Sequence, residues 1–348
     1  LNLRDHLAVG RPRFLAQLEV EFADGSRHSI VSDPTWRVAN GPLMFNSVYL
    51  GEAYDARLET DGWNLAGFDD GAWRHAAPAT EPVGTLQAQP QPPIKVTATV
   101  SPTAVSEPTP GVFIFDMGQN VAGWVSLALT AATGTRITLR YGELLHSDGT
   151  LNPLTSVAGQ IKGRRTTKEG VSQRIGGSGS PDVAWQTDTY VASGRGVETY
   201  TPRFTFHGFR YVEVTGYPGT PSLDAMKGFR LNADVEDAGS FTSSSALLNR
   251  IQEITRRTFL SNLFSVQSDC PHREKFGYGG DIVATSDALM MNFDLARFYE
   301  KSVTDWGDSA RDDGMLTDTA PYVGIQYCGV GWAMVHPALQ WQLYQYYG

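Results

Sequence analysis

The chain has 348 residues, of which 41% are hydrophobic and 19% charged, and its formal net charge is −9. Its length predicts two or three globular domains, and its composition is that of an ordinary folded protein. The acidic balance and the lack of a basic cluster argue against nucleic acid as a partner, because phosphate binding needs Lys and Arg. No apolar run reaches the roughly 20 residues that span a membrane, so we expect no membrane partner either.

The cysteines and histidines predict neither a disulfide scaffold nor a metal site. Cys270 and Cys328 are the only two cysteines and are not spaced as a metal knuckle. His272 and His336 stand alone, without the spacing of zinc ligands. We therefore expect no metal and no cofactor. The chain opens at Leu1 without an initiator Met or a signal sequence, which predicts a piece of a longer protein. A secreted or periplasmic location is favoured over a cytoplasmic one, and the oligomeric state is left open.

The first two thirds of the chain are predicted to be β-structure. Gln17–Phe22 alternates polar and apolar residues, the period of a half-buried strand. An Asp-Gly hairpin signal follows at residues 24–25, and a second strand is expected at His28–Val31. After a Pro-rich break at Pro90–Pro93, short alternating runs separated by turns predict an antiparallel sandwich. These runs lie at residues 125–129, 137–141 and 210–214. Residues 156–184 show no periodicity and are predicted to be a long excursion.

From about residue 236 the pattern becomes helical. Ser243–Ser245 offers an N-cap, and apolar residues then recur every three to four positions from Leu247 to Phe259. Further helices are predicted near residues 282–292, 295–306 and 331–347. Pro337 should kink the last helix or lie near its start. Helices with no strands between them indicate an all-α domain.

A short charged segment, Ser268–Asp281, separates the first two helices. It holds Asp269, Glu274, Arg273 and Asp281, and its three glycines and one proline predict an irregular loop. Polar groups on a loop between rigid elements are typical of a site. From local composition alone, a solvated connection is favoured.

Four stretches carry a resemblance that changes this interpretation. They are Tyr49–Arg57 (YLGEAYDAR), Phe115–Trp124 (FDMGQNVAGW), Pro202–Val214 (PRFTFHGFRYVEV) and the loop itself, which begins Asp-Cys-Pro. Together they resemble the bacterial α-L-rhamnosidases of glycoside hydrolase family 78. The resemblance implies two antiparallel β-sandwich domains followed by the first helices of an (α/α)6 barrel. The implied divisions are a partial lectin-like sandwich over residues 1–95, a concanavalin-like sandwich over 96–232 and the start of the barrel over 233–348.

The family's loop also implies roles for its residues. Glu274 is expected to be the general acid, although the loop is one residue shorter than the commonest form. Tyr278 stands where Trp is usual, and Ala333 and Met334 replace the usual Gly-Asp after Trp332. The residues expected to bind the sugar are Asp269, Arg273, Tyr278, Asp281 and Trp332. For Trp332, a place in the barrel core is an equal alternative.

The chemistry explains why carboxyls are needed here. Glycoside hydrolysis by inversion uses one protonated carboxyl at the leaving oxygen and one carboxylate that activates water. Burial or nearby like charges keep a carboxyl protonated near neutral pH. The family's base is a Glu on a later helix, which is expected beyond Gly348. A solvated surface is favoured for the acidic residues Asp308, Asp312, Asp313 and Asp318.

The expected function is therefore an inverting glycoside hydrolase that releases terminal α-L-rhamnose from glycans or glycosides. Its partner is a carbohydrate that carries terminal L-rhamnose. One alternative is a fragment that binds carbohydrate without turning it over. A weaker alternative is a polysaccharide lyase on a helical barrel, which would need a Tyr, His or Lys base and an acidic sugar. The resemblance favours the hydrolase over both.

Overall fold

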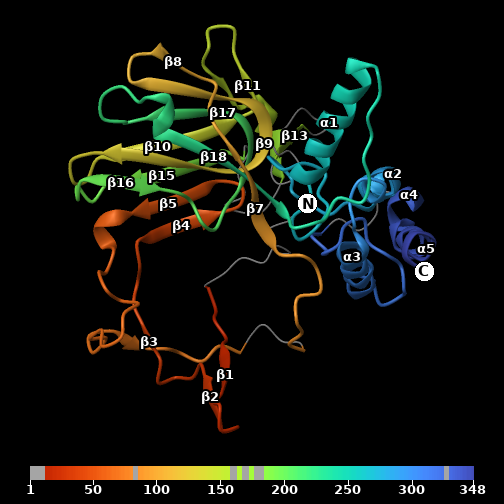
Figure 1. Cartoon of the computed structure of the whole chain (residues 1–348), viewed down its shortest axis with the longest axis horizontal. Helices are drawn as coiled ribbons and strands as arrows, with labels where there is room; N and C mark the ends of the chain where they lie inside the picture. Colours follow the sequence, from red (N-terminus) through yellow and green to blue (C-terminus); the bar gives the residue numbers. More distant parts are fainter. Residues whose placement is uncertain (1–11, 81–84, 157–162, 167–171, 176–183, 325–328) are drawn as a thin grey trace.

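A computed structural model describes residues 12–80, 85–156, 163–166, 172–175, 184–324 and 329–348. Figure 1 shows a β-rich body followed by a group of helices. This arrangement confirms the predicted order of β-structure and then α-structure. The predicted excursion at residues 156–184 includes a two-stranded hairpin, β13 (Gly163–Thr166) with β14 (Ser172–Ile175), and its other residues from 157 to 183 lie outside the described part.

One 10-stranded sheet, which we call the β body, dominates the first 233 residues. Its main path is β4-β5-β15-β10-β17-β9-β18-β7, and β8 and β16 also pair with β9. The bounds are β4 (Leu43–Ser47), β5 (Gly51–Asp55), β7 (Ile94–Val100), β8 (Ala104–Thr109), β9 (Val112–Thr130), β10 (Arg136–Gly142), β15 (Thr187–Val191), β16 (Val197–Tyr200), β17 (His207–Thr215) and β18 (Met226–Ala233).

The remaining strands form small separate pairs. They are β1 (Gln17–Glu21) with β2 (Arg27–Val31), β3 (Arg37–Val38) with β6 (Arg74–His75), and β11 (Leu144–Leu145) with β12 (Leu151–Asn152). The β1–β2 hairpin is the one that the Asp-Gly signal predicts. Short 3-10 turns lie at η2 (Ala56–Leu58), η3 (Pro153–Ser156) and η4 (Leu223–Ala225).

The division into two independent antiparallel sandwiches stays a prediction, and the pairing of β4 and β5 departs from it. β4 and β5, which were expected to belong to the first domain, lie in the β body. β5 runs parallel to β15, with Ala53 opposite Thr189 and Tyr54 opposite Tyr190. The backbone N–H of Glu52 also donates to Asp188, at 2.9 Å. The first segment is therefore joined to the second by strand pairing, and the boundary near residue 95 stays a prediction.

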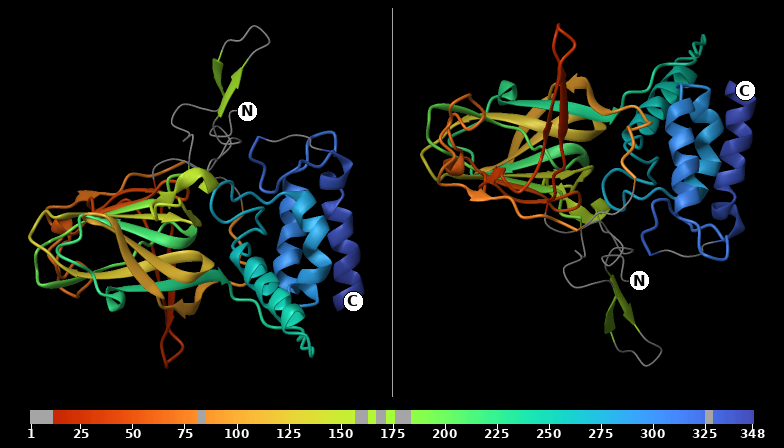
Figure 2. Two further views of the ribbon diagram at one scale, coloured as in Figure 1. Left: turned by 90° about the horizontal axis from the view of Figure 1, so that it is seen from above. Right: turned by 90° about the horizontal axis from the view of Figure 1, so that it is seen from below.

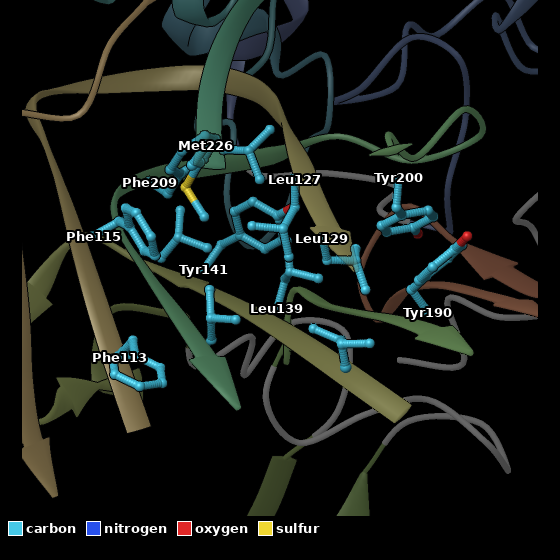
Figure 3. Packing of buried hydrophobic residues seen from close by; sticks show 14 of the residues in the cluster. Phe113, Phe115, Leu127, Leu129, Leu139, Tyr141, Tyr190, Tyr200, Phe209 and Met226 are labelled. Carbon is cyan, nitrogen blue, oxygen red and sulfur yellow. The ribbon is translucent and has the colours of Figure 1, made fainter. Parts of the chain in front are cut away.

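Most of the core of the β body comes from the apolar faces of β9, β10 and β17. Figure 3 shows aromatic and aliphatic side chains from these strands and from β15, β16 and β18 pointing toward one another. Phe115, Leu127, Leu139 and Phe209 are each completely buried. Gly123 lets the long strand β9 pass β18, because a Cβ there would lie 1.9 Å from the carbonyl oxygen of Phe229.

The helices are α1 (Ala246–Ser261), α2 (Gly279–Met290), α3 (Ala296–Asp308), α4 (Val330–Ala333) and α5 (Val335–Tyr347). The Ser245 hydroxyl accepts from the N–H of Leu248, so the predicted N-cap is confirmed. Pro337 lies in the first turn of α5. Figure 2 shows the helices side by side at one end of the β body, with α5 outermost. Among the described residues, no helix is long and apolar enough to cross a membrane.

The apolar stripe of α1 has an unexpected setting. The sequence pattern predicts the helix, yet none of its residues is buried. Leu247 is 69% exposed, and Leu248, Ile251 and Ile254 are also exposed. Packing instead concentrates between α2, α3 and α5, around Phe298, Tyr299 and Trp306.

Candidate active site

The predicted loop lies between α1 and α2, where the helices meet the β body. Its irregular part ends at Tyr278, and Gly279 begins α2, so Asp281 lies in the first helical turn and not in the loop. We call residues 268–278 the site loop. Two hydrogen bonds join the two ends of the site loop, both at 3.1 Å. The N–H of Asp269 donates to the carbonyl of Phe276, and the N–H of Phe276 donates to the carboxylate of Asp269.

Glu274 is the most buried carboxyl of the site loop, with 4% of its surface exposed. The hydroxyl of Tyr278 donates to its Oε2 at 2.9 Å, and Arg273 Nε lies 3.9 Å from its Oε1. Burial raises the pKa of Glu274, and the charge of Asp269 and more weakly that of Asp281 add to this effect. The Tyr278 hydrogen bond and Arg273 oppose it. A carboxyl of this kind can hold a proton at a higher pH than usual.

The two neighbouring carboxyls share this environment. Burial raises the pKa of Asp269, against hydrogen bonds that lower it, including one from the thiol of Cys270 at 2.8 Å. Burial also raises the pKa of Asp281, and the charge of Asp269 adds to this. Burial raises the pKa of the Cys270 thiol to about 11, so this cysteine is a hydrogen-bond donor and not a thiolate.

Trp332 joins the site from α4. A Cβ on Gly280 would lie 2.5 Å from its indole, so the glycine lets the ring lie against the first turn of α2. Trp332 is 37% exposed, which differs from a fully buried place in a helical core. All six predicted site residues therefore come from the site loop, the first turn of α2 and the adjoining α4.

The sequence reasoning missed three features around the site. The hydroxyl of Tyr49 donates to the carbonyl oxygen of Glu274 at 2.9 Å. The Lys275 side chain reaches the β body. Asp318 is completely buried, with neither carboxylate oxygen bonded to a described residue, so its predicted solvated setting is wrong. The backbone carbonyl of Asp318 accepts a hydrogen bond from the N–H of Gly279, so Asp318 lies beside the start of α2. Asp308, Asp312 and Asp313 are exposed, as predicted.

Residues of the β body also contact the site loop. His272 Nε2 lies 3.5 Å from Glu143, and Asn120 donates to the same carboxylate at 2.7 Å. A Cβ on Gly208 would lie 2.9 Å from that of His272, so glycine permits the close approach of strand and loop. Within the described ranges, no three His, Cys, Asp or Glu side chains are grouped so that they could hold a metal ion.

Comparison with protein families covers almost the whole chain. Residues 2–98 match the α-L-rhamnosidase N-terminal domain, residues 106–232 match the bacterial α-L-rhamnosidase concanavalin-like domain, and residues 236–348 match the bacterial α-L-rhamnosidase 6 hairpin glycosidase domain. The chain belongs to the bacterial α-L-rhamnosidases of glycoside hydrolase family 78. The family predicted from the loop and strand motifs is therefore confirmed.

Individual rhamnosidases align over nearly the full chain. An α-L-rhamnosidase of Streptomyces avermitilis is 39% identical over 341 residues, which are 97% of this chain and 31% of that protein. The structure of α-L-rhamnosidase from Dictyoglumus thermophilum matches with a TM-score of 0.86 and 38% identity, over 95% of this chain and 35% of that one. The Streptomyces avermitilis enzyme complexed with L-rhamnose matches with a TM-score of 0.85 and 37% identity, over 95% of this chain and 30% of that one. The chain thus spans about a third of the length of these relatives.

Proposed function

We propose that the protein is an inverting α-L-rhamnosidase in which Glu274 protonates the leaving oxygen. The observation that carries this proposal is the setting of Glu274: a buried carboxyl beside Asp269, with a raised pKa and a tyrosine hydroxyl on one oxygen. A general acid must hold its proton until the transition state and then give it up to the departing oxygen.

We assign the other predicted residues to the sugar. Asp269 and Asp281 accept hydrogen bonds from ring hydroxyls, and Arg273, which is exposed, donates to one. Trp332 offers an aromatic face. The hydroxyl of Tyr278 is engaged by Glu274, so its role in this scheme is to hold the acid while its ring borders the sugar. We assign the general base to none of the described residues; inversion needs it roughly 6.5–9.5 Å from Glu274.

We propose that α1 to α5 belong to an (α/α)6 barrel. The open apolar face of α1 supports a helical domain with more layers than the described residues provide, because large exposed apolar patches usually have a partner.

The stereochemistry of the product tests the reaction. The full-length protein is incubated with an aryl α-L-rhamnoside, and proton NMR follows the first sugar released. The β-anomer appearing before mutarotation is the expected result. Release of the α-anomer first would contradict inversion, and an unsaturated product absorbing in the ultraviolet would instead indicate a lyase. Binding of rhamnose in a calorimeter without turnover would favour the non-catalytic alternative.

Replacing Asp269 with Asn is expected to shift the alkaline limb of the kcat/KM profile to lower pH. The limb reports loss of the proton from Glu274, and removing a neighbouring negative charge lowers that pKa. Asp281→Asn should shift the same limb less, because Asp281 contributes less to the pKa of Glu274. The pH profiles of the three proteins are compared at fixed ionic strength. If the alkaline limb of Asp269→Asn stays at the pH of the unchanged protein, the charge of Asp269 does not act on the pKa of Glu274.

A further inference from the structure

Lys275 follows Glu274 directly, and its side chain leaves the site loop for the β body. Its ammonium donates to the carbonyl oxygen of Val48, in the β4–β5 turn, and to that of Phe206, just before β17, at 2.6 Å. It also lies 3.9 Å above the centre of the Phe206 ring, a cation–π distance. One side chain therefore ties the site loop to two separate segments of the β body.

The backbone of Lys275 indicates that this arrangement is enforced. Its φ is +58°, in the left-handed region that a residue with a side chain seldom adopts. Glycine would adopt this conformation readily. Strained residues of this kind persist only where surrounding contacts hold them, and they gather at functional sites.

A second contact acts on the same stretch of backbone. Tyr49, the neighbour of Val48, donates its hydroxyl to the carbonyl oxygen of Glu274. The carbonyl of Glu274 and the side chain of Lys275 are thus both held by residues 48–49. The Tyr49 ring is itself fixed in a buried cluster with Phe276 and Tyr278.

We propose that Lys275 is a positioning residue, which locks the site loop onto the β body and so fixes the place of Glu274. The proposal rests on the proposed role of Glu274 as the proton donor. The β body then has a direct part in catalysis: it holds the acid in register with the leaving oxygen, where an error of about 1 Å can cost 100-fold in rate.

The test uses Lys275→Met in the full-length protein, because Met keeps much of the length but loses the charge and the donors. We expect kcat on an aryl α-L-rhamnoside to fall about 10- to 100-fold, with KM changed less than about threefold. Amide hydrogen exchange within residues 269–277 should become about tenfold faster. Lys275→Arg should recover part of both losses. Lys227→Met, on an exposed position of β18, is the matched control and should change neither.

Tyr49→Phe is the second variant, and it removes only the hydroxyl that holds the Glu274 carbonyl. It should show a smaller kcat loss with the same faster exchange, and it keeps the test valid if Lys275→Met fails to fold. Unchanged exchange in the site loop of folded Lys275 and Tyr49 variants would overturn the proposal, whatever happens to kcat. Faster exchange in a protein that never hydrolyses rhamnosides would leave the lock standing and remove the proposed function instead.

Discussion

Glu274→Gln is expected to slow hydrolysis of an alkyl α-L-rhamnoside about 10²- to 10⁴-fold, the usual contribution of a general acid. Glutamine has nearly the same shape as glutamate and can still accept the hydrogen bond from Tyr278, so the site should keep its geometry. It has no acidic proton to give to the departing oxygen. The change is therefore a test of proton donation more than of packing.

The leaving group separates this role from the others that a carboxyl could have. When an aryl rhamnoside carries strongly electron-withdrawing substituents, its phenolate departs without being protonated. The rate of hydrolysis of such a substrate by Glu274→Gln should therefore fall far less than that of the alkyl substrate. Rates for both substrates are measured in steady state on the full-length protein. Asp312→Asn, at an exposed carboxyl, serves as the control. Equal losses on the two substrates would assign Glu274 another role, and undiminished activity would remove it from the site.

Asp188→Ala is expected to destabilise the protein by roughly 2–6 kcal/mol, at about 1–3 kcal/mol for each of two buried donors that lose their acceptor. Asp188 is completely buried, and its carboxylate lies 3.1 Å from His207 Nε2 and accepts from the N–H of Glu52. Alanine would leave both groups without their acceptor inside the sheet. Urea unfolding at neutral pH gives the free energy of unfolding.

The exposed residue Asp224 supplies the control for this change. Asp224→Ala should alter the free energy of unfolding by less than about 0.5 kcal/mol, as is usual for surface positions. Asp188→Asn, which retains one acceptor oxygen, should lie between the two. A loss below about 1 kcal/mol in Asp188→Ala would mean that water replaces the carboxylate and that the network adds little to stability.

Local patterns predicted what is determined locally. The β1–β2 hairpin follows from alternation and an Asp-Gly turn, and the start of α1 follows from a serine cap. The family motifs singled out one loop, and in the structure the predicted residues of that loop lie around Glu274. Asp116, in the Phe115–Trp124 motif, forms a two-pronged pair with Arg210 of the Pro202–Val214 motif, at 2.8 Å for each bond. Such short-range or motif-borne features carry their own signal in the sequence.

Features that depend on distant segments were not predictable in this way. No residue of β5 indicates that it pairs in parallel with β15, because hydrogen bonds between backbones carry no sequence label. The burial of Asp318 follows from the pairing of residues 318–320 with 277–279, and an acidic residue in a polar loop gives no sign of it. Lys275 is similar: a lysine in a charged loop suggests solvent, and only the β body supplies its two carbonyl partners.

The parallel pairing of β5 with β15 also determines when this edge of the sheet can form during synthesis. Glu52 and Asp188 are 136 residues apart. A ribosome that adds roughly 5–20 residues per second needs about 7–27 s to make that interval. During this interval β5 has no β15 to pair with, so one edge of the β4–β5 hairpin is unpaired. Unpaired strand edges can pair with other chains. β4 and β5 are therefore synthesised before the other strands of the β body, and this edge of the sheet is completed only after most of its centre has left the ribosome.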